Sequence, residues 1–175
     1  MNSSHNFFSL FELPLSCEVD TVLLEQKYKQ LQAQLHPDRH LNSESGNKLA
    51  VIQQASMLND AYATLKSPLP RAEHLLQLRG IDTSVYNQAD LDKEFLLAQL
   101  KLREELEELQ LQTKPEALVD LQVKVEKELA AIWTGFSTQF TGGHYQAAYR
   151  AFRELQFLQK LLDEIREAED RLLDY

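Results

Sequence analysis

The sequence contains a single cysteine, Cys17, among its 175 residues. One thiol forms neither an internal disulfide nor a zinc or iron–sulfur site that needs several thiolates from one chain. Glycine and proline are also scarce, with five of each, so few turns interrupt the chain and its elements must be long. Valine and isoleucine together number 11 against 32 leucines, which favours helices because unbranched leucine keeps its rotamers in a helix.

Basic residues are outnumbered by acidic ones, 18 to 27, and the net charge is -9. A phosphate backbone is therefore an unfavourable partner, and we do not expect nucleic acid binding. No window approaches 18 apolar residues without a charge, and the first 25 residues lack a basic segment followed by an apolar one. We therefore expect no membrane-spanning helix and no secretory signal, and a cytoplasmic location.

Apolar residues recur at helical spacing in residues 1–80. Residues 7–11 predict a short aromatic turn, and Asp20 is the expected N-cap of a helix that must end at Pro37. Residues 38–47 are polar and predict a loop, after which a second long helix runs to Ser67 and a short one spans 71–79. The two long helices carry the apolar stripes Leu24, Tyr28, Leu31 and Leu35, and Val51, Ala55, Leu58, Tyr62 and Leu65.

Residues 81–175 predict a linker over 81–89 and three further helices. These helices span about 90–112, 115–140 and 144 to the end, with Asp90 as the N-cap of the first. Short connections make sequential helices antiparallel neighbours, so we expect a three-helix bundle. The core stripe expected on the first helix comprises Leu91, Phe95, Ala98, Leu102, Leu106 and Leu109.

Motifs for catalysis or metal binding are missing from the sequence. It has no phosphate-binding glycine loop, no G-x-S-x-G and no H-E-x-x-H. His36 and His40 are four residues apart, but Pro37 breaks the helix that a metal site at this spacing requires. We interpret the run of carboxylates at 104–108 as a solvated helix face. We therefore expect no catalytic residue, no metal ligand and no cofactor, and a protein that is not an enzyme.

The tripeptide His36-Pro37-Asp38 stands between the two long helices of the first half. By itself it predicts only a helix stop followed by a turn. Its setting is a short aromatic helix, an amphipathic helix ending at the tripeptide, a polar loop and an antiparallel amphipathic helix, and this order resembles a J-domain. Residues 59–65, Asn-Asp-Ala-Tyr-Ala-Thr-Leu, are similar to the end of the third J-domain helix.

Motifs in both halves resemble the HscB-type iron–sulfur cluster co-chaperones. They are residues 68–76 (Pro-Leu-Pro-Arg-Ala-Glu-His-Leu-Leu), Phe95-Leu96, Gln99 and Arg103-Glu104-x-Leu106. The resemblance covers essentially the whole chain. It implies an all-α, L-shaped protein with a J-domain helical hairpin and connecting helix in residues 1–80 and a C-terminal three-helix bundle in residues 81–175. One departure is Lys101, where we expect an acidic or neutral residue in the family.

The resemblance also implies a partner for the tripeptide, namely an ATPase chaperone of the DnaK/HscA class whose ATP hydrolysis is stimulated by docking. Pro37 restricts the backbone, so a carboxylate beside it can meet a cationic groove at little ordering cost. Two lysines on the preceding helix are placed to steer a negatively charged partner. The expected chaperone-binding residues are His36, Pro37, Asp38, Arg39, Lys27 and Lys29.

A second surface is expected on the first helix of the bundle. At about 100° per residue, Leu96 and Leu100 lie about 160° from Ala98, opposite the expected core. Phe157 and Leu161 extend this surface if the first and last helices are neighbours. Such residues either pack against the rest of the protein or bind a partner, and the resemblance implies an IscU-type iron–sulfur scaffold as that partner. The expected scaffold-binding residues are Leu96, Leu97, Leu100, Arg103, Glu104 and Phe157. The alternative function is a helical adaptor with no chaperone link.

Overall fold

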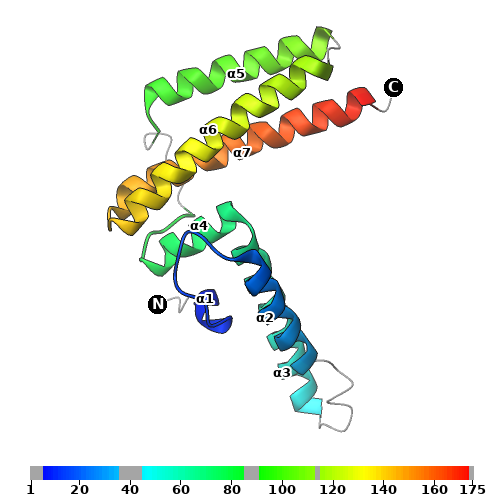
Figure 1. Cartoon of the computed structure of the whole chain (residues 1–175), viewed down its shortest axis with the longest axis vertical. Helices are drawn as coiled ribbons and strands as arrows, with labels where there is room; N and C mark the ends of the chain where they lie inside the picture. The colour runs from blue at the N-terminus through cyan, green and yellow to red at the C-terminus, as the bar shows by residue number, and fades with distance from the viewer. Residues whose placement is uncertain (1–5, 36–44, 85–90, 113–114, 174–175) are drawn as a thin grey trace. The chain divides into compact units, whose positions relative to one another are not determined.

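The computed structural model describes residues 6–35, 45–84, 91–112 and 115–173, and it divides the chain into two compact units, Met1–Gly80 and Ile81–Tyr175. Within these ranges all regular elements are α-helices and no strand occurs (Figure 1). The all-α prediction is therefore confirmed. None of the helices in the described ranges is long and apolar enough to cross a membrane.

The first unit begins with two helices that are capped by side chains. α1 (Phe7–Leu10) is capped by Asn6, and α2 (Thr21–Gln34) is capped by Asp20, as predicted for α2. The Asp20 carboxylate accepts hydrogen bonds from two backbone N–H groups of the first turn, at 2.9 and 3.0 Å. Such a cap satisfies donors that have no partner within the helix and contributes about 1 kcal/mol.

α2 and α3 (Ser45–Lys66) form an antiparallel hairpin (Figure 1). The rings of Tyr28 and Tyr62 stack between them with centroids 4.2 Å apart, and the Tyr28 hydroxyl donates to Asn59 Oδ1 at 2.9 Å. The hairpin was predicted, but α3 begins before the expected end of the loop at residue 47. Residues 45–47 are poor helix formers, yet propensity is a weak preference and extending an existing helix costs little.

α4 (Pro68–Leu78) follows α3 after Ser67. It begins three residues before the predicted start at Arg71, because proline is tolerated in the first turn, where its missing N–H would have no helical partner. Arg71 is buried, and its Nη1 donates to the backbone carbonyl of Cys17 at 2.9 Å. The Cys17 side chain is itself buried.

His74 ties α1 to α4. Its Nε2 accepts a hydrogen bond from the backbone N–H of Phe7 at 3.2 Å, and its ring stacks on the Phe7 ring with centroids 4.4 Å apart. The side chain is buried, and burial lowers the pKa of His74 from its ordinary value of 6.5. The imidazole is therefore held in its neutral form, which is the form that can accept this hydrogen bond.

The first unit is expected to lose stability in mild acid. In the unfolded chain His74 takes up a proton near pH 6.5, whereas its folded pKa is lower, so the unfolded state binds more protons just below pH 6.5. The free energy of unfolding is thus retained above pH 6.5 and falls as the pH decreases through this interval. Urea unfolding followed by circular dichroism at a series of pH values measures the fall.

The matched variant is His74→Gln, whose amide oxygen can still accept from Phe7. Burial also raises the pKa of Glu154 in the second unit, so the stability of the unmodified protein depends on pH for more than one reason. The contribution of His74 is therefore the difference in pH dependence between the unmodified protein and His74→Gln. Trp133 fluorescence follows the second unit in the same samples, because this is the only tryptophan. If the unmodified protein and His74→Gln lost stability equally between neutral and mildly acidic pH, His74 would not be the cause of the loss.

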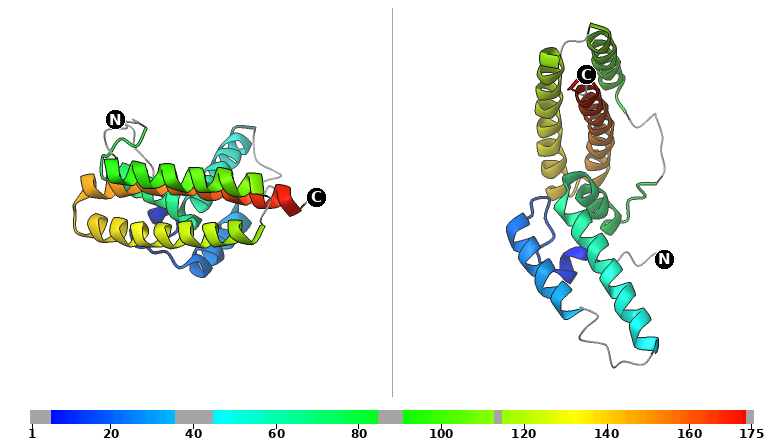
Figure 2. Two further views of the ribbon diagram at one scale, coloured as in Figure 1. Left: turned by 90° about the horizontal axis from the view of Figure 1, so that it is seen from above. Right: turned by 90° about the vertical axis from the view of Figure 1, so that its right-hand side faces the viewer.

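The second unit is a bundle of α5 (Lys93–Gln112), α6 (Pro115–Thr141) and α7 (Tyr145–Leu173), which lie side by side in Figure 2, as predicted. α6 is connected to α7 through Gly143, whose φ of +78° is a backbone conformation that residues other than glycine rarely adopt. α5 begins later than expected. Asp92, rather than Asp90, precedes it and accepts from a first-turn N–H at 3.4 Å, while Asp90 lies outside the described residues.

The core of the bundle contains the predicted leucines, but the buried face of α5 is rotated from the one that the sequence predicted. Ala98 is exposed, and Gln99 is buried in its place. The large side chains of Leu102 and Leu106 determine which face of α5 is buried, whereas alanine gains little from burial. The fully or largely buried core comprises Leu102, Leu106, Leu118, Leu121, Val125, Leu158, Leu161, Leu162, Ile165 and Ala168.

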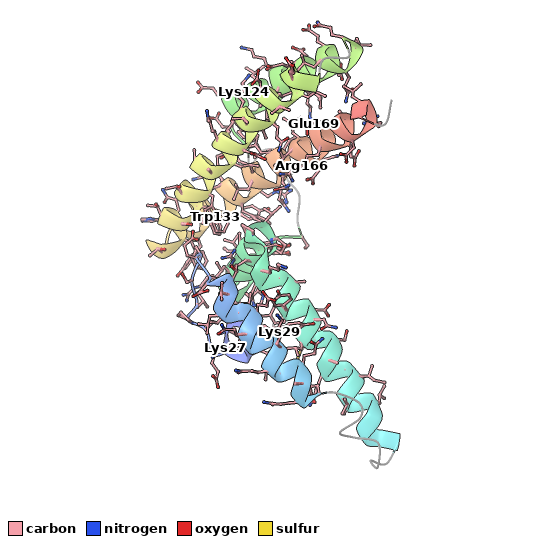
Figure 3. The ribbon with its side chains drawn as sticks, turned by 45° about the vertical axis from the view of Figure 1, so that its right-hand side comes forward. Lys27, Lys29, Lys124, Trp133, Arg166 and Glu169 are labelled. Atoms are coloured by element: carbon pink, nitrogen blue, oxygen red, sulfur yellow. The ribbon has the colours of Figure 1, made fainter. Side chains whose placement is uncertain are left out.

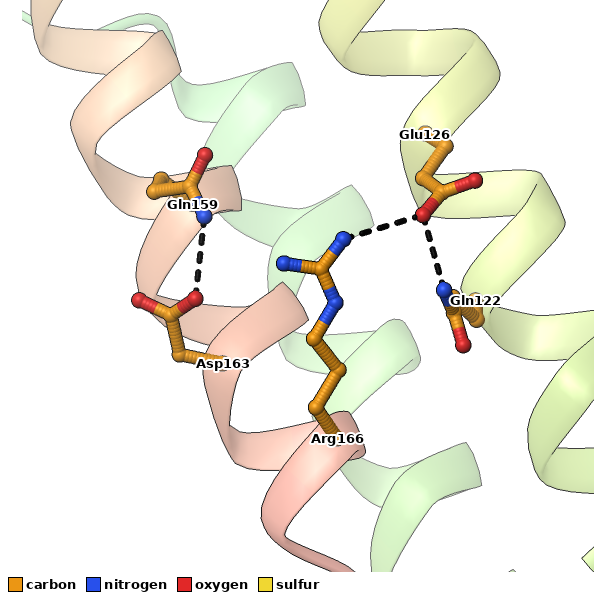
Figure 4. Close-up of polar contacts among 5 residues, drawn as sticks. All are labelled: Gln122, Glu126, Gln159, Asp163 and Arg166. Atoms are coloured by element: carbon orange, nitrogen blue, oxygen red, sulfur yellow. Dashed lines mark hydrogen bonds and ion pairs between the residues drawn. The ribbon is translucent and has the colours of Figure 1, made fainter. Parts of the chain in front are cut away.

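Polar contacts on the surface of the bundle link α6 to α7. Glu126 on α6 accepts from Arg166 on α7 at 3.2 Å and from Gln122 at 2.8 Å, and Gln159 donates to Asp163 at 2.9 Å along α7 (Figure 4). Exposed pairs of this kind contribute less than about 1 kcal/mol each. The apolar core, rather than these contacts, therefore stabilises the bundle.

Candidate partner-binding sites

The predicted chaperone-binding tripeptide lies outside the residues that the structure describes, as does Arg39. The two helices that bracket it are described. α2 ends at Gln34, and α3 begins at Ser45 and packs antiparallel to α2 (Figure 1). The tripeptide thus connects two helices that are fixed to each other by the stacked rings of Tyr28 and Tyr62.

The two lysines predicted to steer the chaperone both lie on α2, and each forms an ion pair (Figure 3). Lys27 Nζ lies 3.0 Å from Glu12 Oε2, and Lys29 Nζ lies 2.7 Å from Glu25 Oε1. The hydrogen bond to Glu25 raises the pKa of Lys29, so this lysine stays charged. The two ion pairs reduce the positive charge that these lysines present to a partner. Because exposed pairs are weak, a more acidic partner surface can compete for the lysines.

Leu97 and Leu100 are exposed apolar residues in the first half of α5, with exposed fractions of 61% and 54%. Leu96 and Leu100 were predicted to lie opposite the core; this is correct for Leu100 but wrong for Leu96, which is half-buried. The reason is the rotation of α5 that buries Gln99 in place of Ala98. Leu97 and Leu100 are three residues apart, so their side chains are neighbours on one face of the helix.

Phe157 of α7 lies beside α5. Its ring meets the ring of Phe95 edge-on, with centroids 6.4 Å apart and an interplanar angle of 86°. It is half-buried, so part of the ring remains accessible. Leu161, which was expected to extend the same surface, is wholly buried, and that expectation was wrong. Leu161 belongs to the apolar core of the bundle, which leaves Phe157 as the accessible apolar residue of the predicted pair.

The two charged residues predicted for the surface on α5 differ in their surroundings. Arg103 bridges α5 and α7 through Glu164, with Nη1 and Oε2 3.4 Å apart. Glu104 is exposed. Its neighbour Glu105 pairs with Lys124 of α6 at 2.8 Å. The interpretation of the acidic run as a surface-facing feature fits these contacts, because its other members, Glu107 and Glu108, are exposed.

A pocket between α5 and α7 was not anticipated from the sequence. It has a volume of about 490 Å³ and is lined by Arg103, Arg153, Gln156, Phe157 and Lys160. The signal was available, because residues 153, 156, 157 and 160 have the spacing of one helical face. Arg153 and Lys160, the two basic residues of α7 in this pocket, were not among the residues predicted to bind a partner.

Comparison with known proteins assigns the family. Residues 91–166 match the family model of the HSCB C-terminal oligomerisation domain. A co-chaperone protein HscB homolog of Vibrio cholerae is 40% identical over 169 residues, which cover 96% of this chain and 99% of that protein. The chain belongs to the HscB co-chaperone family.

Solved structures of HscB have the same fold. The chaperone HscB from Vibrio cholerae superposes with a TM-score of 0.85 at 39% identity, over 95% of this chain and 99% of that one. Human co-chaperone HscB gives a TM-score of 0.86 at 25% identity, over 95% of this chain and 83% of the human chain. These similarities span both units of the chain.

Membership of the HscB family confirms the resemblance seen in the motifs, which identified the chain with the co-chaperones of iron–sulfur cluster assembly. Co-chaperones act on a partner chaperone, and their role is regulatory. The matched C-terminal domain of HscB includes the exposed leucines of α5, Phe157 and the pocket beside it. In the part of the chain that the structure describes, no group of three or more histidine, cysteine or acidic residues is placed to hold a metal ion.

Proposed function

We propose that this HscB-family chain stimulates ATP hydrolysis by a DnaK/HscA-class chaperone and delivers an IscU-type iron–sulfur scaffold to it. The first unit docks on the chaperone through His36, Pro37, Asp38 and Arg39, with Lys27 and Lys29 beside them. The second unit binds the scaffold through the leucine face, by which we mean Leu96, Leu97, Leu100, Arg103, Glu104 and Phe157. The observation that carries the proposal is the exposure of Leu97 and Leu100 on α5.

The rigid hairpin supports the chaperone-binding half of the proposal. α2 and α3 are joined by the Tyr28–Tyr62 stack and the hydrogen bond from Tyr28 to Asn59. Proline restricts its own backbone and that of the residue before it. The proline in the sequence therefore lowers the conformational freedom that the tripeptide has to lose on binding, which favours affinity.

The composition of the leucine face supports the scaffold-binding half. Two exposed leucines provide apolar anchors, and charged residues such as Glu104 stand beside them. Partner-binding surfaces commonly have apolar anchors at the centre and a polar rim. Burying one leucine side chain against a partner contributes about 1.5–3 kcal/mol. The pair can therefore supply a large part of the affinity for a scaffold.

Delivery follows from having both surfaces in one chain. A scaffold bound to the second unit reaches the chaperone bound to the first unit by an encounter within one complex. Linking two binding events in this way raises the effective concentration of the second partner without any new contact. The proposal thus explains why a single co-chaperone carries two surfaces of different chemistry.

The single-turnover rate of ATP hydrolysis by a purified DnaK/HscA-class chaperone tests the proposal. It is measured alone, with this chain, with an IscU-type scaffold and with both. We expect acceleration by the chain, and a larger acceleration with both proteins than the separate effects account for. No acceleration by the chain would contradict the chaperone-binding half and would favour the adaptor alternative. No additional effect of the scaffold would contradict delivery.

A further inference from the structure

The pocket between α5 and α7 is cationic in an acidic part of the chain. From residue 77 onward the sequence has 12 basic and 19 acidic residues. The pocket is lined by three basic side chains, one amide and one aromatic ring, and no carboxylate is among the lining residues. We call these residues, Arg103, Arg153, Gln156, Phe157 and Lys160, the basic pocket. Its charge is opposite to that of the surrounding unit.

Internal contacts hold the two arginines of the basic pocket in place. Arg153 is largely buried, its Nη1 donates to Gln156 Oε1 at 2.7 Å, and its guanidinium carbon lies 5.9 Å from the centre of the Tyr149 ring. Arg103 is held by its ion pair with Glu164. A guanidinium that is already oriented loses little freedom when it binds an anion, and its planar donors match the two oxygens of a carboxylate.

The basic pocket continues the leucine face. Leu96, Leu100 and Arg103 follow one another at intervals of four and three residues, so they lie along one side of α5. Phe157 belongs to both surfaces, since it lines the pocket and its ring meets α5 at Phe95. A protein that covers the leucines therefore places its adjoining residues over the pocket.

We propose that the basic pocket receives an aspartate or glutamate side chain of the scaffold protein that docks on the leucine face. The inference rests on the proposed function, because it assumes that this face binds a scaffold. Apolar burial is not directional, whereas a carboxylate that must reach three basic groups fixes the position of the partner along α5. The pocket thus determines register and specificity, and the leucines supply the anchor.

Lys160→Gln is the variant that tests the proposal, because this lysine is exposed and its replacement leaves the core unchanged. Isothermal titration with an IscU-type scaffold is expected to give a Kd raised about three- to tenfold, as for the loss of one charge contact at an interface. Lys127→Gln on α6 is the matched control, since Lys127 is also exposed and the charge change is the same. It is expected to change the Kd by less than about twofold.

Double-variant measurements identify the carboxylate. Aspartates and glutamates on the scaffold surface are replaced one at a time by their amides, and each scaffold is titrated with the unmodified chain and with Lys160→Gln. For one of them, Lys160→Gln is expected to have no further effect on the Kd. Equal effects of Lys160→Gln and Lys127→Gln, or the absence of any coupled carboxylate, would overturn the inference while leaving the proposed function intact. A scaffold that fails to bind the unmodified chain overturns both.

Discussion

Replacement of Asp38 by asparagine is expected to abolish stimulation of the chaperone's ATPase. Asparagine has nearly the same size as aspartate but no charge, so the change removes the carboxylate and little else. A charge that pairs with a cationic groove of a partner is worth about 2–5 kcal/mol when its loss leaves the partner's charge buried and unpaired. The affinity is then reduced by a factor on the order of 30 to several thousand, which eliminates stimulation at ordinary protein concentrations.

The measurement is the single-turnover ATPase rate of a DnaK/HscA-class chaperone over a range of concentrations of each chain. Asp120→Asn, an exposed position on α6, makes the same change of charge in the second unit and is expected to leave stimulation unchanged. Affinity for the scaffold and the circular dichroism spectrum are expected to be unaffected by Asp38→Asn. Undiminished stimulation by Asp38→Asn would show that the tripeptide is only a turn, and the chaperone-binding role assigned to it would be wrong.

Replacing both Leu97 and Leu100 by alanine is expected to weaken scaffold binding by about 3–5 kcal/mol, which corresponds to a Kd raised by a factor on the order of one hundred to several thousand. Both side chains are more than half exposed, so their truncation removes contact area for a partner and leaves no cavity in the bundle. Leu96 is unsuitable for this test because it is half-buried, and its truncation also affects packing.

Leu111→Ala is the matched control for the leucine pair. This residue has an exposed fraction of 86% and lies on the same side of α5, but it stands about three helical turns beyond Leu100 and so tests whether position along the helix matters. We expect its truncation to leave scaffold affinity within about twofold of the original value, since scattered surface leucines carry little binding energy. Isothermal titration of the scaffold measures both variants. If the paired variant bound the scaffold as tightly as Leu111→Ala does, the leucine face would not be the docking surface.

The helices of both units could be predicted because leucine spacing and capping residues are local signals. Asp20 is an example, since an aspartate directly before an amphipathic stretch commonly caps the N-terminus of a helix. The orientation of α5 could not be predicted with the same accuracy. One residue corresponds to about 100° of rotation, so a stripe that is displaced by one position buries Gln99 in place of Ala98. That rotation also leaves Leu96 half-buried, whereas Leu97 is exposed.

Features that depend on two helices at once were harder to derive. Leu161 and Phe157 both lie at the edge of the apolar stripe of α7, but Leu161 is buried in the core shared by the three helices, whereas Phe157 remains accessible. The basic pocket combines Arg103 of α5 with Lys160 of α7, residues that are far apart in the sequence. Sequence periodicity indicates which side of each helix is apolar, but it does not tell which residues of two helices meet.

The contacts made by α4 have a consequence for how the chain can be divided. Arg71 holds the carbonyl of Cys17, and His74 holds the N–H of Phe7, so the segment that leads into α2 is fastened by a helix that follows α3 in sequence. The α2–α3 hairpin is therefore not an autonomous part. A graft that transfers the proposed chaperone-docking hairpin to another protein must include residues up to Gly80, because a transplant ending at Ser67 leaves Phe8 and Phe11 without the helix that secures their segment.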